Sequence, residues 1–306
     1  MIIEYRFRHI VCIMDLTVFT PSFNRAHTLS RTYASLCRQT CKDFKWVLVD
    51  DGSTDNTSDL VRKWIDDGII QIEYYYKTNG GMASAHNEAY RHIDTLLAVC
   101  IDSDDWMPDD GVETIISEWK GRGSSEYAGI IGVDIYSDLS IVGTPFPDTL
   151  DHCRVRDMAR KYKVHGDKKY VFRTDVIKSY LPYPEIKGER YGGVNYLYQV
   201  IDLKYEMLCS NSPYCIVEYQ EDGLTANIFR QYRESPRTHL LEREALISAL
   251  DYFPDRFRHS IHFVSCAIFA KDYKALSKTK NKGLVICAIP FGILLNIYVR
   301  IKLKQK

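Results

Sequence analysis

The stretch FKWVLVDDGSTDNT, residues 44–57, passes within a few positions from an apolar run to a cluster of turn-forming residues. The run FKWVLVD predicts a buried strand, because it is short and rich in aromatic and β-branched side chains. DGSTDNT predicts a turn, and a helical pattern follows near residues 58–66. A strand, a polar turn and a helix in this order indicate one unit of an α/β sheet.

The same unit recurs on both sides of this stretch. LTVFT, residues 16–20, predicts a strand that Pro21 stops, and a helical pattern follows over about residues 28–39. IIQIEYYY predicts a third strand, and an alanine-rich helix at residues 83–93 follows the break at residues 79–81. LLAVCID predicts a fourth strand. We therefore predict a mostly parallel sheet with helices on both faces.

Three polar clusters follow the ends of these predicted strands, at residues 20–25, 50–53 and 102–105. In open parallel sheets, ligands bind at the carboxyl ends of the strands. We therefore expect the three clusters to converge in space, although long segments of sequence separate them.

The segment IDSDDWMPDD carries five carboxylates, which repel one another unless a cation lies between them. Asp102 and Asp104 suit a hard divalent cation, which prefers oxygen ligands. An EF-hand calcium loop is excluded, because a tryptophan and a methionine occupy its fifth-ligand and glycine positions. A plain acidic turn is the alternative for the pair, and Asp109 with Asp110 suit the positive end of the helix that follows.

A metal with few protein ligands usually takes its remaining ligands from substrate phosphates. This favours an enzyme of glycosyl or nucleotidyl transfer, in which a metal neutralises the departing diphosphate. Asp51, at the end of a strand, could accept the imino proton of a pyrimidine base, while Gly52 permits a close backbone turn. An Asx turn with an N-cap explains the same residues and is compatible with that role. No GxGxxG or Walker A pattern occurs, so a dehydrogenase or P-loop enzyme lacks its main support.

The bulk composition excludes some classes of function. Forty basic and forty acidic residues cancel, which argues against a nucleic-acid partner. Residues 1–15 are too charged for a signal peptide, and the nine cysteines lack metal-ligand spacing, so we expect reduced thiols in a cytoplasmic protein. For His259 and His262, three positions apart, we expect a packed or exposed helix pair rather than a metal site.

Beyond residue 228 the pattern is helical, and its last segment, residues 284–299, is largely apolar. Pro290, Gly292 and Asn296 interrupt this run, and basic residues follow it. A membrane span needs about 20 apolar residues. We expect a helix that lies on an anionic membrane surface rather than one that crosses it; a soluble helix pair packed on the body of the protein is the alternative.

Four motifs, TVFTPSFNR, CRQTCKDFKWVLVDDGSTDNT, NGGMASAHNEAY and IDSDDWMPDD, occur in this order and closely resemble the family 2 glycosyltransferases. HGDKKYVFRTDVIKSYLPYPEIKGERYGG and YCIVEYQEDGLTANIFRQYRESP look like the bacterial branch that builds capsules and other surface polysaccharides. The resemblance covers roughly residues 16–238. It implies a GT-A fold, with a Rossmann-like nucleotide-binding sheet and a C-terminal helical extension. Its expected divisions are residues 1–110 for the nucleotide sugar, 111–227 for the acceptor and 228–306 for the helical, membrane-associating region.

The resemblance also implies roles for individual residues. Asp104 would be the principal ligand of Mn²⁺ or Mg²⁺, with Asp102 near the metal and the ribose. Asp105 would support the loop or the donor sugar, and Thr20 and Asp51 would lie near the uracil. The other residues implied in binding the donor are Pro21, Asn24, Arg25, Gly80, Gly81, Ser103 and Arg233. His86 stands where the family often has arginine, and a helix-face histidine is the default reading.

Family members invert the anomeric centre, and a carboxylate removes the proton of the acceptor hydroxyl. Relatives commonly carry this acid before a helix where the present chain has Val194, flanked by Gly193 and Asn195. Glu189 is the nearest acidic candidate, and a salt-bridged loop glutamate is its alternative. Asp167 and Asp222 are further candidates.

Arg230 shares a predicted helix face with Arg233 or Arg237, and these cations could close over the diphosphate. A solvated basic face, or one that meets lipid phosphates, is the alternative.

The resulting hypothesis is a metal-dependent inverting glycosyltransferase that uses a nucleotide-sugar donor, UDP-linked, and acts in surface polysaccharide synthesis. Its acceptor would be a glycan on a polyprenyl-diphosphate carrier at the inner face of the cell membrane, and a homo-oligomer or a partner transferase is compatible with it. One alternative is nucleotidyl transfer to a sugar phosphate, although the phosphate loop expected near the first strand is missing. Another is a catalytically impaired donor-binding subunit of a partner glycosyltransferase.

Overall fold

The computed structural model describes residues 14–190, 194–218 and 228–304. The strands are β1 (Leu16–Ser22), β2 (Phe44–Asp50), β3 (Ile72–Tyr76), β4 (Leu97–Cys100), β5 (Tyr127–Ile135), β6 (His152–Cys153), β7 (Lys168–Arg173) and β8 (Glu206–Ile216). The helices are α1 (Ala26–Arg38), α2 (Thr57–Asp67), α3 (Met82–His92), α4 (Gly111–Arg122), α5 (Asp157–Arg160), α6 (Thr174–Lys178), α7 (Asn195–Ile201), α8 (Ile228–Glu234), α9 (Pro236–Ala249), α10 (Phe253–Ala270), α11 (Lys274–Lys278) and α12 (Lys282–Lys304).

The eight strands in the described residues form one mixed sheet, in the order β3-β2-β1-β4-β7-β5-β8-β6. β1 to β4 pair in parallel, as predicted, and β5 pairs in parallel with β8. β7 lies antiparallel between β4 and β5. The start of β7 therefore lies at the same edge of the sheet as the carboxyl ends of β4 and β5.

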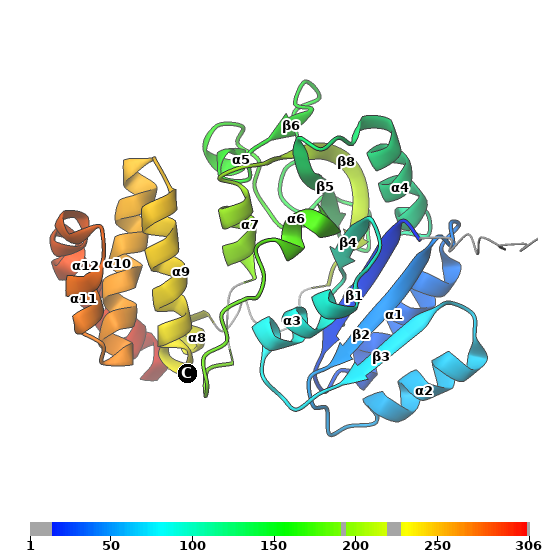
Figure 1. Cartoon of the computed structure of the whole chain (residues 1–306), viewed down its shortest axis with the longest axis horizontal. Helices are drawn as coiled ribbons and strands as arrows, with labels where there is room; N and C mark the ends of the chain where they lie inside the picture. Colours follow the sequence, from blue (N-terminus) through cyan, green and yellow to red (C-terminus); the bar gives the residue numbers. More distant parts are fainter. Residues whose placement is uncertain (1–13, 191–193, 219–227, 305–306) are drawn as a thin grey trace, which may run out of the picture.

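Helices cover both faces of this sheet, as the sequence predicted (Figure 1). Alternate residues of each central strand point to opposite faces. In β2, Trp46 and Leu48 join one apolar core, which α1, α2 and α4 complete. Val47 and Val49 join a second core with α3, α6 and α7. The central strands β1, β2 and β4 are therefore mainly apolar, because both of their faces are buried.

β1 extends beyond the predicted stop at Pro21. The strand continues to Ser22, and Pro21 pairs with Val49 of β2. β4, the neighbour on the other side, pairs only with the segment up to Phe19. The missing N–H of proline is tolerated because no β4 residue pairs with it there.

Gly129 of β5 lies too close to β7 for any side chain. A Cβ at this position would be 1.9 Å from the carbonyl oxygen of Val171. We expect Gly129→Ala to lower the free energy of unfolding by about 2–3 kcal/mol, because the two strands must separate. Urea unfolding measures this change. Gly121→Ala on α4, where a Cβ meets nothing within 4 Å, is the matched control and should stabilise the protein slightly. Equal effects of the two substitutions would contradict the prediction.

The C-terminal helices α8 to α12 gather on one side of the sheet domain (Figure 1). The helix expected in the last segment is α12, which runs unbroken through Pro290. Gly292 and Asn296 lie on its buried face. A Cβ at Gly292 would be 2.4 Å from Val264 of α10, and the Asn296 amide donates to the Ser265 carbonyl at 3.1 Å. The polar and small residues are therefore packing features, and they leave the exposed face of α12 apolar.

α12 is long and apolar enough to cross a membrane, judged by its length and by the mean hydropathy of 2.1 over its most apolar 18 residues. Its exposed apolar residues include Ile286, Phe291, Ile293, Leu294, Ile297, Tyr298 and Ile301. One face of the helix packs on α10 through buried Val285, Ala288 and Val299. The other face therefore presents an apolar surface beside the basic residues of the last turn.

His259 of α10 is buried, and the Arg243 guanidinium donates to its Nδ1 at 2.9 Å. Burial lowers the pKa of His259 to about 3, and the charge of Arg243 adds to this effect. The unfolded chain binds a proton here near pH 6.5 and the folded chain does not, so stability is lost as the pH falls below 6.5.

We expect His259→Gln to remove about 2 kcal/mol of this pH dependence between pH 8 and pH 5. Glutamine can still accept the hydrogen bond but does not titrate. Urea unfolding at the two pH values measures the difference, with exposed His27→Gln as the control. An unchanged pH dependence in His259→Gln would show that another group is responsible.

Candidate functional site

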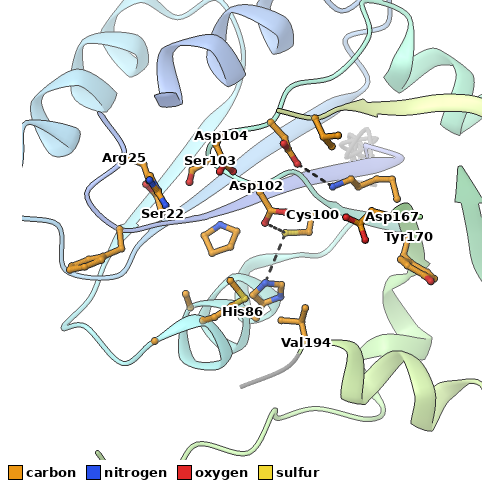
Figure 2. Close-up of a pocket in the computed structure, with 18 of the residues that line it drawn as sticks. Ser22, Arg25, His86, Cys100, Asp102, Ser103, Asp104, Asp167, Tyr170 and Val194 are labelled. Carbon is orange, nitrogen blue, oxygen red and sulfur yellow. Dashed lines mark hydrogen bonds and ion pairs between the residues drawn. The ribbon is translucent and has the colours of Figure 1, made fainter. Parts of the chain in front are cut away.

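A cavity of about 1000 Å³ lies at the carboxyl ends of the central strands, where the polar clusters were expected to meet. In Figure 2, Ser22 and Arg25 lie at one end of this cavity and Asp167 and Tyr170 at the other, with Asp102 between them. Loops that are distant in sequence therefore form one continuous pocket.

The loops after β1 and β2 are tied together at one end of the cavity. Asn24 has a φ of 53°, a left-handed conformation that asparagine tolerates better than most residues. Its backbone N–H donates to Ser53 Oγ at 2.8 Å, and its side-chain oxygen accepts from the Thr54 N–H at 2.8 Å. Asn24 therefore holds the two loops in register.

Asp51 organises the loop after β3. Its carboxylate accepts hydrogen bonds from the backbone N–H groups of Gly80 at 2.9 Å and Gly81 at 2.7 Å. Lys77 forms an ion pair with the same carboxylate at 2.8 Å. Gly81 has a φ of 87°, and a Cβ there would be 2.2 Å from the Arg190 carbonyl oxygen. The close backbone approach therefore requires glycine at this position.

The acidic loop after β4 forms the middle of the cavity. Asp102 and Asp104 both line it, and burial together with the Asp102 charge raises the pKa of Asp104. Burial raises the pKa of Asp105 to about 7, although Lys169, 3.7 Å away, opposes the shift. Asp105 thus has a protein cation beside it, whereas Asp102 and Asp104 repel each other at the surface of the pocket.

The opposite wall comes from β5, β7 and α7. Asp134 is 2% exposed, its Oδ1 has no hydrogen-bond partner among the described residues, and burial raises its pKa to about 6. Asp167 precedes β7 and lines the same wall. Tyr170 and Tyr198 pack with their ring centroids 4.8 Å apart. Val194 also lines the cavity, at the N-cap of α7.

His86 and Cys100 lie below Asp102 in Figure 2. His86 is buried, and its Nε2 is 4.0 Å from the Cys100 Sγ, which in turn donates to Asp102 Oδ1 at 3.8 Å. Burial lowers the pKa of His86 to about 4, so the imidazole is neutral at pH 7. This side chain therefore adds no positive charge to the pocket.

Most of the predicted site residues line the cavity. They are Pro21, Arg25, Asp51, Gly81, Asp102, Ser103, Asp104, Asp105 and Asp167. Gly80 does not line it but donates to Asp51. The alternative positions Gly193 and Asp222 lie outside the described residues, as does the N-terminal segment 1–13.

Thr20, Glu189 and Arg233 make other contacts. Thr20 is fully buried, donates to the Ile101 carbonyl at 2.7 Å and accepts from the Trp46 indole at 3.0 Å. Glu189 accepts from the first turn of α9, at 2.7 Å from the Thr238 N–H. Arg233 is about half exposed and lies 3.4 Å from Glu234. None of the three is part of the described lining of the cavity.

The donor set of the acidic loop fits a hard divalent cation that is completed by substrate oxygens. No group of three histidine, cysteine, aspartate or glutamate side chains within the described ranges could hold a metal alone. Asp102 and Asp104 are two carboxylates, and burial together with the Asp102 charge raises the pKa of Asp104, so a bound cation would favour its charged form. Mg²⁺ is usually held by one or two carboxylates together with phosphates, which matches this arrangement.

The sequence analysis missed Asp134 and Lys169 as parts of the site. Asp134 is a carboxylate inside the apolar stretch AGIIGVDIY. A charged residue in an otherwise apolar segment is the sequence feature that could have identified it. Lys169 lies in HGDKKYVFR and reaches Asp105 only because β7 crosses the sheet beside β4. Pairing of distant strands brought both residues into the cavity.

Comparison with known proteins agrees with this geometry. Residues 17–165 match the family model described as glycosyl transferase family 2. A chondroitin synthase of Pasteurella multocida is 32% identical over 111 residues, which are 36% of this chain and 11% of that protein. A validoxylamine A glucosyltransferase of Streptomyces hygroscopicus is 40% identical over 92 residues, 29% of this chain and 21% of the relative. The chain thus spans less than a quarter of the length of either relative.

Solved structures share the fold at low sequence identity. TarS of S. aureus, residues 1–349 in complex with UDP-GlcNAc, has a TM-score of 0.59 and 15% identity, covering 95% of this chain and 92% of that one. The mannosyltransferase PcManGT of Pyrobaculum calidifontis, in complex with GDP-Man and Mn²⁺, has a TM-score of 0.51 and 16% identity, covering 91% and 86%. Residues 17–165, just under half of the chain, are thus similar to glycosyl transferase family 2, and the strand order and the solved structures indicate a fold of the GT-A type.

Proposed function

We propose that the protein transfers a sugar from a nucleotide donor, UDP-linked, to a hydroxyl group of a glycan acceptor, with inversion at the anomeric carbon. The observation that carries this proposal is the single cavity in which Asp51 at one end and Asp102 with Asp104 in the middle face the same space. Two relatives, a chondroitin synthase and a hyaluronan synthase, and the TarS complex with UDP-GlcNAc support it.

The nucleoside would occupy the end of the cavity lined by Pro21 and Asp51, and the diphosphate would lie toward Arg25. Asp102 and Asp104 would hold Mn²⁺ or Mg²⁺ against the diphosphate. Both ions prefer oxygen ligands, and the two neighbouring carboxylates repel each other unless a cation is bound. When bound, such an ion neutralises the charge that develops on the departing nucleoside diphosphate. Asp105 would support the loop through its contact with Lys169.

We assign the general base to Asp167. It lines the wall across the cavity from the acidic loop, whereas the Glu189 carboxylate is engaged by α9. In the reaction, the acceptor oxygen forms a bond to the anomeric carbon as the bond from that carbon to the phosphate oxygen breaks. The Asp167 carboxylate takes the hydroxyl proton, and the electron pair leaves with the nucleoside diphosphate.

The surface of α12 supports a membrane-linked acceptor. Its apolar exposed face and its basic end, with Lys302 and Lys304, suit a helix that lies in the surface of an anionic membrane. The face that packs on α10 argues against a separate spanning helix. The protein would then act peripherally at the inner face of the cell membrane, on an acceptor linked to polyprenyl diphosphate.

The test is release of nucleoside diphosphate by the purified full chain from a panel of UDP- and GDP-sugars, with Mn²⁺, Mg²⁺ or EDTA. We expect UDP from one UDP-sugar, in a metal-dependent reaction. Release of pyrophosphate instead would support nucleotidyl transfer, and UDP binding without turnover would support a donor-binding subunit of a partner transferase. Absence of any nucleotide binding in the presence of Mn²⁺ would refute the proposal.

A further inference from the structure

Arg31 of α1 connects two parts of the site, the acidic loop and the segment after β8. Its Nη2 donates to the carbonyl oxygen of Asp104 at 2.7 Å. Its guanidinium lies 4.0 Å over the ring of Trp106. Its Nη1 forms an ion pair with Glu218, which lines the cavity after the end of β8. One side chain therefore contacts the acidic loop twice and the segment after β8 once.

The neighbouring residues of α1 hold the same loop. Thr32 Oγ1 donates to the Asp105 carbonyl at 2.7 Å, and Ser35 Oγ accepts from the Met107 N–H at 3.2 Å. Thr32 and Ser35 are fully buried, whereas the Arg31 side chain is 37% exposed. Thr32 and Ser35 belong to the core. Arg31 is the more exposed residue, and its partners Asp104 and Glu218 line the cavity.

The ion pair between Arg31 and Glu218 stabilises the fold little. The ion pair with Glu218 is exposed enough for water to screen it. The bond to the Asp104 carbonyl instead limits the rotation of the residue whose carboxylate faces the cavity. Small displacements of such groups cost far more in activity than in stability, because binding and reaction require a narrow geometry.

We propose that Arg31 is a positioning residue for the carboxylate of Asp104, and that it sets the affinity of the acidic loop for the divalent cation. The inference rests on the proposed function. Arginine is required because its planar guanidinium can donate to a carbonyl, pair with a carboxylate and stack on an indole at once, whereas lysine offers one ammonium. The role is therefore one of geometry and not of charge alone.

The test measures binding of UDP to the full chain by calorimetry, with Mn²⁺ and with EDTA, for wild type, Arg31→Lys and Arg31→Met. We expect both variants to lose about tenfold in UDP affinity in Mn²⁺, the scale found for residues that orient metal ligands. In EDTA their affinity should equal that of wild type, and thermal unfolding should be nearly unchanged. Arg38→Lys is the matched control, because Arg38 is also on α1 and pairs with Asp109 at 2.9 Å.

Each other outcome overturns the inference. Wild-type affinity of Arg31→Lys in Mn²⁺ would show that charge alone matters. An equal loss in Mn²⁺ and in EDTA, or a loss that follows a lowered unfolding temperature, would show a structural role. If wild type itself shows no Mn²⁺-dependent binding of UDP, the proposed function fails first and the inference fails with it.

Discussion

Asp104→Asn is expected to lower kcat by roughly 10²- to 10³-fold, because it weakens the hold on the cation that would stabilise the leaving diphosphate, and losing one preorganised electrostatic contact costs about this much. Asp104 lines the cavity, and burial beside Asp102 raises its pKa. Asparagine has a similar shape but lacks the charge, so the affinity for Mn²⁺ should fall as well. Steady-state release of nucleoside diphosphate and calorimetric titration of Mn²⁺ measure the two effects.

Stability should change in the opposite direction to activity. Removing a half-buried negative charge beside Asp102 relieves repulsion, so the unfolding temperature of Asp104→Asn should be equal to or above that of wild type. Asp109→Asn is the matched control, since Asp109 is exposed and pairs with Arg38 outside the cavity. Similar kinetic losses in the two variants, or full activity of Asp104→Asn, would remove Asp104 from the metal-binding role.

Asp167→Asn is expected to lower kcat by roughly 10²- to 10⁴-fold while leaving the affinity for the donor nearly unchanged, because a general base acts in the transition state and not in binding. Asp167 lines the cavity wall across from the acidic loop. Single-turnover kinetics with saturating donor, together with calorimetric titration of UDP, separate the chemical step from donor binding.

Glu189→Gln distinguishes the two candidates for the base. Glu189 accepts hydrogen bonds from the first turn of α9, at 3.0 Å from the Arg237 N–H and 2.8 Å from Thr238 Oγ1. We expect this variant to lower the unfolding temperature and to retain most of its kcat. A large loss of kcat in Glu189→Gln at unchanged stability, with an active Asp167→Asn, would return the role to Glu189.

Much of the region before residue 110 was predictable, because its signals are local. The run of Phe44–Asp50 and the turn after it specify a strand and its end, and the polar clusters follow from the rule for parallel sheets. The acidic pair Asp102 and Asp104 was found in this way and lines the cavity. Its role stays a prediction, as do the residue roles and the division of the chain at residues 110 and 227.

The other wall was less predictable for a physical reason. β7 runs antiparallel between β4 and β5, so its residues reach the cavity through pairings that no local pattern encodes. Thr20 shows the converse effect. It lies in a polar cluster at a strand end, but its hydroxyl is used inside the sheet by Ile101 and Trp46. Local chemistry identified the residue, and packing decided its contacts.

By itself the sequence determined the alternation of strands and helices, the edge of the sheet where the loops converge and the acidic loop after β4, because periodicity and turn chemistry are properties of neighbouring residues. The tertiary structure alone decided that Glu189 caps α9, that Asp134 and Lys169 enter the cavity, and that Arg31 holds the Asp104 carbonyl. These contacts join residues far apart in the chain, and only the completed sheet and its packed helices bring them within bonding distance.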